Sequence, residues 1–140
     1  MATKYMRLGF KSLRNNQISN IYSNNKKIGY SFEFYLNFYR GLHLSNIENV
    51  EIYINDCQVN EYSIRINEKQ FESDELKDLF AEFWSIKTPL IFEIIDGEGV
   101  KKGNYKVEVV LHIRCPYMQF GPNLYANIDS SDREIMEVKN

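Results

Sequence analysis

The sequence predicts an all-β protein, an antiparallel β-sandwich that carries one short helix. Two long segments, residues 28–39 and 105–114, place apolar side chains at every second position, as a half-buried strand does. Short strand-like runs bounded by polar turns recur at regular spacing along the rest of the chain. This spacing is typical of a sandwich or a barrel-like relative, in which facing apolar stripes bury one another.

Length and composition indicate one domain. The chain has 140 residues, of which 44% are hydrophobic and 14% aromatic, and this favours a packed β structure over disorder. We predict a sandwich domain over residues 1–118 and a C-terminal extension over residues 119–140, which either contacts a partner or is disordered. Because the net charge is only -2, charge gives no case for binding nucleic acid or an acidic membrane. No segment has the length of a membrane span, and no secretory signal pattern is present.

The clearest strand lies in the N-terminal third. Residues 10–22 are weakly patterned and hold one or two short strands, and Ser23-Asn24-Asn25-Lys26 is a turn signal. The strand over residues 28–39 then ends at the turn Phe38-Tyr39-Arg40-Gly41. Its apolar face consists of Ile28, Tyr30, Phe32, Phe34, Leu36 and Phe38.

Two hairpins are expected next. Asn55-Asp56 and Asn67-Glu68 mark their turns, because asparagine and aspartate tolerate the positive φ that a tight hairpin needs. The predicted hairpins pair residues 50–54 with 57–59 and residues 63–66 with 69–71.

One helix and two strands complete the prediction. Leu76, Leu79, Phe80 and Phe83 recur at helical spacing and predict a short amphipathic helix over residues 73–84. Residues 90–94 alternate as a strand. The last strand starts at Gly103-Asn104 and is expected to end at Pro116, because proline cannot donate a ladder hydrogen bond.

The two cysteines, Cys57 and Cys115, are far apart and have no other metal-binding residue at ligand spacing. A disulfide would form only if their two strands met. We therefore expect free, buried thiols in a reducing, cytoplasmic compartment.

Catalytic patterns are weak throughout the chain. Neither His43 nor His112 stands in the context of a serine hydrolase base. His112 and Glu108 share one strand face, yet four residues span roughly 13 Å, which is too far for one ion without other ligands. Strand carboxylates such as Glu33, Glu93 and Glu108 are explained by an exposed sheet face. Trp84 offers either a sugar-stacking ring or, by its place at the end of an amphipathic segment, a core side chain.

Arg40 stands between Tyr39 and Gly41, where the buried strand must turn. Its guanidinium fork either fastens the loop by binding backbone carbonyls or binds a carboxylate on another chain. Exposed tyrosine and arginine are also the residue types that protein interfaces favour.

These residues resemble a known family. The stretch Tyr39-Arg40-Gly41-Leu42-x-Leu44-Ser45 and the stretch Arg114-x-Pro116-Tyr117-Met118 are similar to the beta subunit of bacterial C-glycoside deglycosidases. The resemblance covers roughly residues 27–118. This chain departs from the family pattern at His43, where proline is usual, and at Cys115, where an aliphatic residue is usual.

The resemblance implies a lyase complex in which a small β-sandwich supports a (β/α)8-barrel alpha subunit. The complex would break the carbon–carbon bond between a 3-oxo sugar and an aromatic aglycone, as in flavonoid C-glucosides. The alpha subunit would hold the catalytic residues and a divalent metal, manganese, and this chain would hold neither cofactor nor metal. The residues expected at the partner interface or the edge of its pocket are Tyr39, Arg40, Gly41, His43, Tyr117 and Met118.

Two other functions compete with this one. A free-standing carbohydrate-binding β-sandwich would stack sugar on an exposed aromatic ring such as Trp84, Tyr35 or Tyr53. An independent glycosidase would need a carboxylate pair, which two residues distant in the chain can form. Activity or stability that depends on a companion protein would favour the subunit.

Overall fold

The structure is a computed structural model that describes residues 5–121 and 124–138, with side chains for residues 5–115 and 127–138. Strands make up 57% of it and helix 7%, which confirms the predicted all-β class. No helix in these ranges is long and apolar enough to cross a membrane.

The elements are short except for one strand. The 3₁₀ helices are η1 (Leu44–Asn46) and η2 (Ser73–Asp78). The strands are β1 (Tyr5–Met6), β2 (Gln17–Ser23), β3 (Lys26–Phe34), β4 (Leu42–His43), β5 (Ile47–Ile54), β6 (Cys57–Val59), β7 (Ser63–Ile66), β8 (Lys69–Glu72), β9 (Phe83–Trp84), β10 (Leu90–Ile95), β11 (Gly103–Gly121), β12 (Leu124–Asp129) and β13 (Asp132–Val138).

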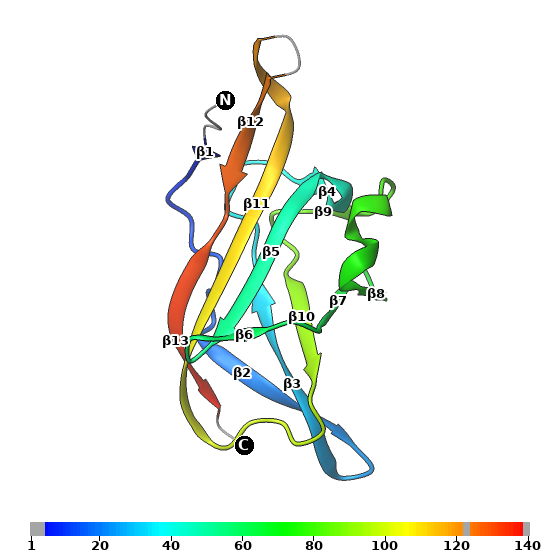
Figure 1. The fold of residues 1–140 in the computed structure, drawn as a ribbon, viewed down its shortest axis with the longest axis vertical. Coiled ribbons are helices and arrows are strands. Elements are labelled where there is room, and N and C mark those ends of the chain that lie inside the picture. Colours follow the sequence, from blue (N-terminus) through cyan, green and yellow to red (C-terminus); the bar gives the residue numbers. More distant parts are fainter. Residues whose placement is uncertain (1–4, 122–123, 139–140) are drawn as a thin grey trace.

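Strand β11 is the centre of one half of the large sheet (Figure 1). It pairs with β5 along one edge and with β13 and then β12 along the other. The inward side chains Val107, Val109 and Leu111 are fully buried, as their alternation predicts. The second half of the sheet runs β2-β3-β10-β7-β8 and buries Phe32 and Phe34 of β3.

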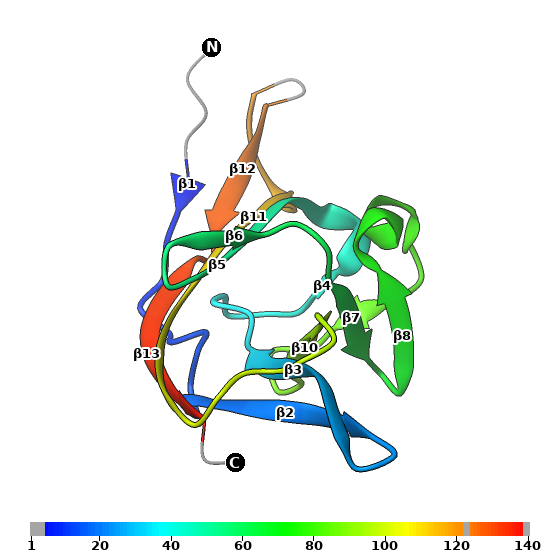
Figure 2. The same cartoon turned by 60° about the horizontal axis from the view of Figure 1, so that its bottom comes forward.

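The two halves are joined where β13 pairs in parallel with β2. Figure 2 shows the resulting sheet curled on itself, so that β11 and β5 lie across the interior from β3 and β10. Both apolar stripes therefore face one common core, as the sandwich prediction requires. A second parallel pair, β1 with β12, makes the sheet mixed rather than wholly antiparallel.

The predicted hairpin turns are confirmed. Asn24 and Asn25, Asn55 and Asp56, and Asn67 and Glu68 all have positive φ, between 50° and 68°. They join β2 to β3, β5 to β6 and β7 to β8. Two consecutive residues at positive φ give the primed turn whose twist matches that of the strands.

The predicted helix over residues 73–84 is only partly present. Its first turns form η2, and Leu76 is buried, but Phe80 is 71% exposed and residues 83–84 are strand β9. The helical spacing gives a wrong prediction for the end of this segment because Trp84 packs in the core. Its side chain is 1% exposed and Nε1 donates a hydrogen bond to Thr88 O at 2.9 Å. The chain must leave helical geometry after Asp78 to bring β9 beside β4.

The C-terminal segment joins the same sheet. Residues 124–138 form β12 and β13, and Ile128, Met136 and Val138 are buried in the core. Strand β11 itself continues beyond the end predicted at Pro116 to Gly121. Its register with β12 shifts between Cys115 and Gln119, so the ladder is irregular where the proline stands.

The thiols are free, as expected from their separation. Cys115 is buried on β11, as predicted. The prediction of burial is wrong for Cys57, which is exposed because β6 pairs only with β5 at the edge of the sheet.

Candidate functional site

The loop after β3, residues 35–41, changes from buried to exposed side chains at its bend. The chain bends over Phe38, Tyr39 and Arg40. Phe38 is 2% exposed and anchors the bend in the core, whereas Tyr39 is 55% exposed with its ring centroid 4.4 Å from that of Phe38. Arg40 is exposed. The bend therefore holds an aromatic ring and a cation at the surface on a buried anchor.

A two-stranded ribbon fixes the far side of this loop. Leu42 and His43 pair with Trp84 and Phe83, and Leu44 N donates to Glu82 O at 2.9 Å. Gly41 lies so close to this ribbon that a Cβ atom there would stand 2.5 Å from Phe83 Cζ and 2.6 Å from Trp84 O. The Phe83 ring could turn aside, but Trp84 O belongs to the backbone, so a side chain at position 41 would require the ribbon itself to shift.

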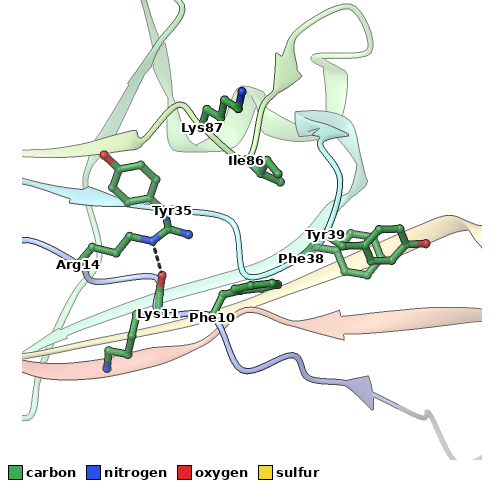
Figure 3. Close-up of a pocket in the computed structure, with 8 residues that line it drawn as sticks. All are labelled: Phe10, Lys11, Arg14, Tyr35, Phe38, Tyr39, Ile86 and Lys87. Atoms are coloured by element: carbon green, nitrogen blue, oxygen red, sulfur yellow. Dashed lines mark hydrogen bonds between the residues drawn. The ribbon is translucent and has the colours of Figure 1, made fainter.

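An open cleft of about 720 Å³ lies beside the loop. Five of its lining side chains are aromatic or aliphatic, three are cations and none is acidic. In Figure 3 the side chains of Arg14, Phe10 and Ile86 lie around a common space, whereas the ammonium end of Lys11 points away from it. The lining residues are Phe10, Lys11, Arg14, Tyr35, Phe38, Tyr39, Ile86 and Lys87.

Arg14 is held in a fixed position within the cleft. Its Nε donates to Lys11 O at 2.7 Å, and its guanidinium carbon lies 4.3 Å from the centroid of the Tyr35 ring. Figure 3 shows both contacts. Stacking on an aromatic face is a favourable arrangement for a guanidinium and limits its rotation.

The charge of Lys11 is compensated within the chain. Its Nζ forms ion pairs with Glu134 and with Asp132, the latter at 3.0 Å. The hydrogen bond to Glu134 raises the pKa of Lys11 most strongly, burial opposes this, and Asp132 adds to the rise. The positive charge that the cleft offers to a ligand therefore comes from Arg14 and Lys87.

Buried polar side chains attach the segment that carries Phe10 to the rest of the fold. Asn37 is 0% exposed; its Oδ1 accepts from Phe10 N at 3.0 Å and its Nδ2 donates to Leu8 O at 2.8 Å. Asn37 N donates to Ser130 Oγ at 2.9 Å, and Ser12 Oγ donates to Ser130 O at 3.1 Å. We call Ser12, Asn37, Ser130 and Asp132 the polar clamp.

Asp132 completes the polar clamp from β13. Its Oδ2 accepts from Ser12 N at 3.1 Å and Leu13 N at 2.9 Å. Burial by itself would raise the pKa of Asp132, but the hydrogen bonds from Leu13 N and Lys11 Nζ outweigh it and hold the pKa below the usual range. The ionised carboxylate therefore fastens residues 11–13 to the last strand.

A comparison with known protein families shows which family this chain belongs to. The profile of one family, described as C-glycoside deglycosidase beta subunit, matches residues 10–117. The chain belongs to this family. The matched range includes the whole loop and all lining residues of the cleft. No curated protein matches the sequence.

The structure of this beta subunit brings four of the predicted interface residues together. Tyr39, Arg40 and Gly41 share the loop, and His43 is exposed on β4 with its ring centroid 5.3 Å from that of Phe83. The other two, Tyr117 and Met118, have side chains outside the described residues, and only their backbone is placed, in β11. Membership of a beta subunit family implies a hetero-oligomer with an alpha subunit.

Five of the lining residues were not predicted from the sequence, namely Phe10, Lys11, Arg14, Ile86 and Lys87. Residues 10–22 carry too weak a pattern to predict a surface, and Lys87 lies in a turn. Tyr35 could have pointed to the cleft, because it is a large aromatic residue on the polar face of the clearest strand.

The structure tests one of the competing sites directly. Trp84 is buried, so the core interpretation is confirmed and the sugar platform is excluded. Tyr35 lies under Arg14, and Tyr53 Oη donates to Glu51 Oε1 at 2.5 Å. Among residues 5–121 and 124–138, no three histidine, cysteine, aspartate or glutamate side chains gather as a metal site.

Two of the predicted strand carboxylates have partners of their own. Glu33 Oε1 accepts from Asn15 Nδ2 at 2.9 Å, and Glu93 Oε1 lies 3.3 Å from Arg65 Nε. Each of these two carboxylates is therefore paired with a neighbouring polar side chain.

Proposed function

We propose that this beta subunit is the supporting, non-catalytic partner of a (β/α)8-barrel alpha subunit in a bacterial carbon–carbon lyase. The substrate would be a 3-oxo C-glucoside with an aromatic, flavonoid aglycone. The observation that carries the proposal is the family match over residues 10–117, which spans the exposed Tyr39-Arg40-Gly41 loop. A reducing cytoplasm would suit the free thiols of Cys57 and Cys115.

The proposed reaction is an elimination on the alpha subunit. The ketone acidifies the neighbouring C–H, and a base of the alpha subunit takes that proton. The electron pair forms a carbon–carbon double bond, the bond to the aglycone breaks, and the aglycone leaves with the bonding pair and is protonated. A divalent ion, manganese, bound to the alpha subunit would stabilise the enolate oxygen.

The part of this chain is to dock. We propose that the loop contacts the alpha subunit or the edge of its pocket, together with Tyr117 and Met118. An exposed tyrosine and arginine on a buried anchor support this, since these residue types often carry most of the binding energy of an interface. Rigid attachment through Gly41 and the β4–β9 ribbon would reduce the entropy lost on binding.

The test is reconstitution. The chain and its alpha subunit are produced separately and together, and cleavage of a 3-oxo flavonoid C-glucoside is followed by release of the aglycone. We expect release only when both chains are present. Cleavage by this chain alone would refute its supporting role, and an undiminished rate for the alpha subunit alone would show that the beta subunit is dispensable.

A second experiment tests the loop. Arg40→Ala is expected to weaken binding to the alpha subunit about tenfold or more, the size of effect that a central interface arginine has. Arg65→Ala is the control, because Arg65 lies on β7 in a surface ion pair with Glu93. Circular dichroism verifies that both variants fold. Equal binding by the two variants would remove Arg40 from the interface.

A further inference from the structure

We propose that the cleft binds an acidic segment of the alpha subunit that carries a carboxylate next to an apolar side chain. The proposal rests on the proposed function, since it requires that an alpha subunit docks. It adds a second contact to the loop and specifies the chemistry of the partner surface. Its components are a net positive charge, a preset guanidinium and an exposed apolar wall.

The cleft has the opposite charge to the chain as a whole. The net charge of the protein is -2, yet the residues that line the cleft include three cations and no acid. Lys11 is neutralised by Asp132 and Glu134. Lys87 makes no side-chain hydrogen bond or ion pair within the described part of the chain, so with Arg14 it leaves the cleft positive. Charge complementarity therefore favours an acidic occupant.

Arg14 selects a carboxylate in particular. Its Nε is used by Lys11 O and its plane is stacked on Tyr35. Among the residues the structure describes, Nη1 and Nη2 make no hydrogen bond. Two parallel donors on a fixed plane match the two oxygens of a carboxylate, which is the geometry of a bidentate pair.

The remaining wall is apolar and exposed. Phe10 is 52% exposed and Tyr39 is 55% exposed, and both line the cleft with Ile86. Large aromatic side chains exposed on one concave surface mark an interaction site rather than ordinary surface. An apolar side chain beside the carboxylate would cover them.

The occupant is a chain segment because the cleft is open and continuous with the loop. Tyr39 belongs to both, so a partner that covers Arg40 reaches the cleft without a gap. The polar clamp holds residues 10–13 against the loop segment, so the cleft exists before binding. A preformed site spares the ordering cost of association.

The test is a set of charge changes measured against the purified alpha subunit. Arg14→Glu and Lys87→Glu are each expected to raise the Kd at least tenfold at low salt. Arg14→Lys, which keeps the charge and loses the fork, should give a smaller increase. Lys26→Glu is the matched control, since Lys26 is exposed at the opposite end of β3, roughly 27 Å from the strand end that precedes Tyr35. We expect its Kd to stay within twofold of the wild type.

Salt separates charge from packing in the same experiment. Binding of the wild type and of Lys26→Glu should weaken as salt rises, and binding of the Arg14→Glu variant should depend less on salt. If Arg14→Glu folds poorly, Lys87→Glu still tests the proposal, because the Lys87 side chain makes no hydrogen bond or ion pair in the described residues and is exposed.

Three results would overturn the proposal. If the wild type binds the alpha subunit and the Arg14 and Lys87 variants bind as well as Lys26→Glu, the cleft is not a docking site although the proposed function stands. If the wild type does not bind at all, the proposed function itself fails. If benzoate saturates the cleft of the isolated chain in an Arg14-dependent way and association is unaffected by these variants, the cleft binds a small acid instead.

Discussion

Two regions of this beta subunit are built by different means. Around β11 the interior is apolar. Four side chains of β11 are 0% exposed and make apolar contacts with the facing half of the sheet, namely Val107, Val109, Leu111 and Ile113. Around the cleft buried polar groups accompany the apolar anchor Phe38, and Ser12, Asn37 and Ser130 hold the chain by hydrogen bonds. Hydrophobic burial is non-directional and tolerates adjustment, whereas each hydrogen bond fixes a distance and an angle.

The difference between the two regions indicates that they have different roles in the fold. The apolar region should set the free energy of unfolding, and the polar clamp should set the shape of the cleft. Mutations in the first region are expected to change global stability most. Mutations in the second should affect the cleft and partner binding more than their effect on stability would suggest.

The largest effect is expected for Leu111→Ala. The truncation leaves a cavity beside β5 in a fully buried position and should lower the free energy of unfolding by about 2–5 kcal/mol. Urea denaturation measures it. Val110→Ala, on the half-buried outer face of the same strand, is the control and should cost much less. If the two variants were equally stable, β11 would not be the apolar centre of the fold.

Asn37→Ala should follow. It leaves the part-buried groups Phe10 N and Leu8 O without their partners, and the loss should lower the free energy of unfolding by about 1–3 kcal/mol in all, because full burial would be needed for that cost at each group. We also expect faster amide hydrogen exchange at residues 8–13 than the loss of global stability explains. Asn49→Ala, which removes a part-buried hydrogen bond to Glu51, is the control. Unchanged exchange at residues 8–13 would contradict the role of the polar clamp.

Gly41→Ala sharpens the comparison at the loop. The added Cβ collides with Phe83 Cζ and Trp84 O, so the β4–β9 ribbon must shift, at a cost of roughly 1–3 kcal/mol. Binding to the alpha subunit should weaken as well. Gly9→Ala is the matched control, because a Cβ there meets no heavy atom within 4 Å. Stability and binding like those of Gly9→Ala would show that the ribbon does not restrain the loop.

The smallest effect is a pH dependence. The pKa of Asp132 is lowered in the folded protein, so its ionised form stabilises the fold above about pH 4, the unfolded pKa. That contribution is lost as the pH falls through the lower folded-state pKa. Asp132→Asn should therefore unfold with a flatter pH profile below pH 4. A loss of stability below pH 4 that is as steep in Asp132→Asn as in the wild type would contradict this role of Asp132.

The sequence predicts the parts of the fold that depend on local pattern. Alternation placed Phe32 and Phe34 on the buried face of β3, and Asn55-Asp56 marked the hairpin between β5 and β6, because side-chain direction and positive φ are set within a few residues. The polar sequence of β13 gave no such signal. Its place in the sheet depends on pairing with β11 and β2, which are distant in the chain.

The candidate site was predictable only in part for the same reason. Tyr39 and Arg40 follow a clean strand and can be recognised from their neighbours. Arg14 reaches the cleft only because Ser12 meets Ser130, a contact between residues 118 positions apart. A pattern read over a short window cannot contain that contact.

The attachment of residues 11–13 to Asp132 also bears on the order of events during synthesis. Asp132 emerges from the ribosome after every residue that lines the cleft. Ser130 emerges two residues before Asp132 and so also after the lining residues. A nascent chain thus presents an incomplete surface to the alpha subunit until Asp132 has been synthesised. Assembly of the two subunits would then select for chains that extend through β13, and a product terminated before Asp132 would not be recognised.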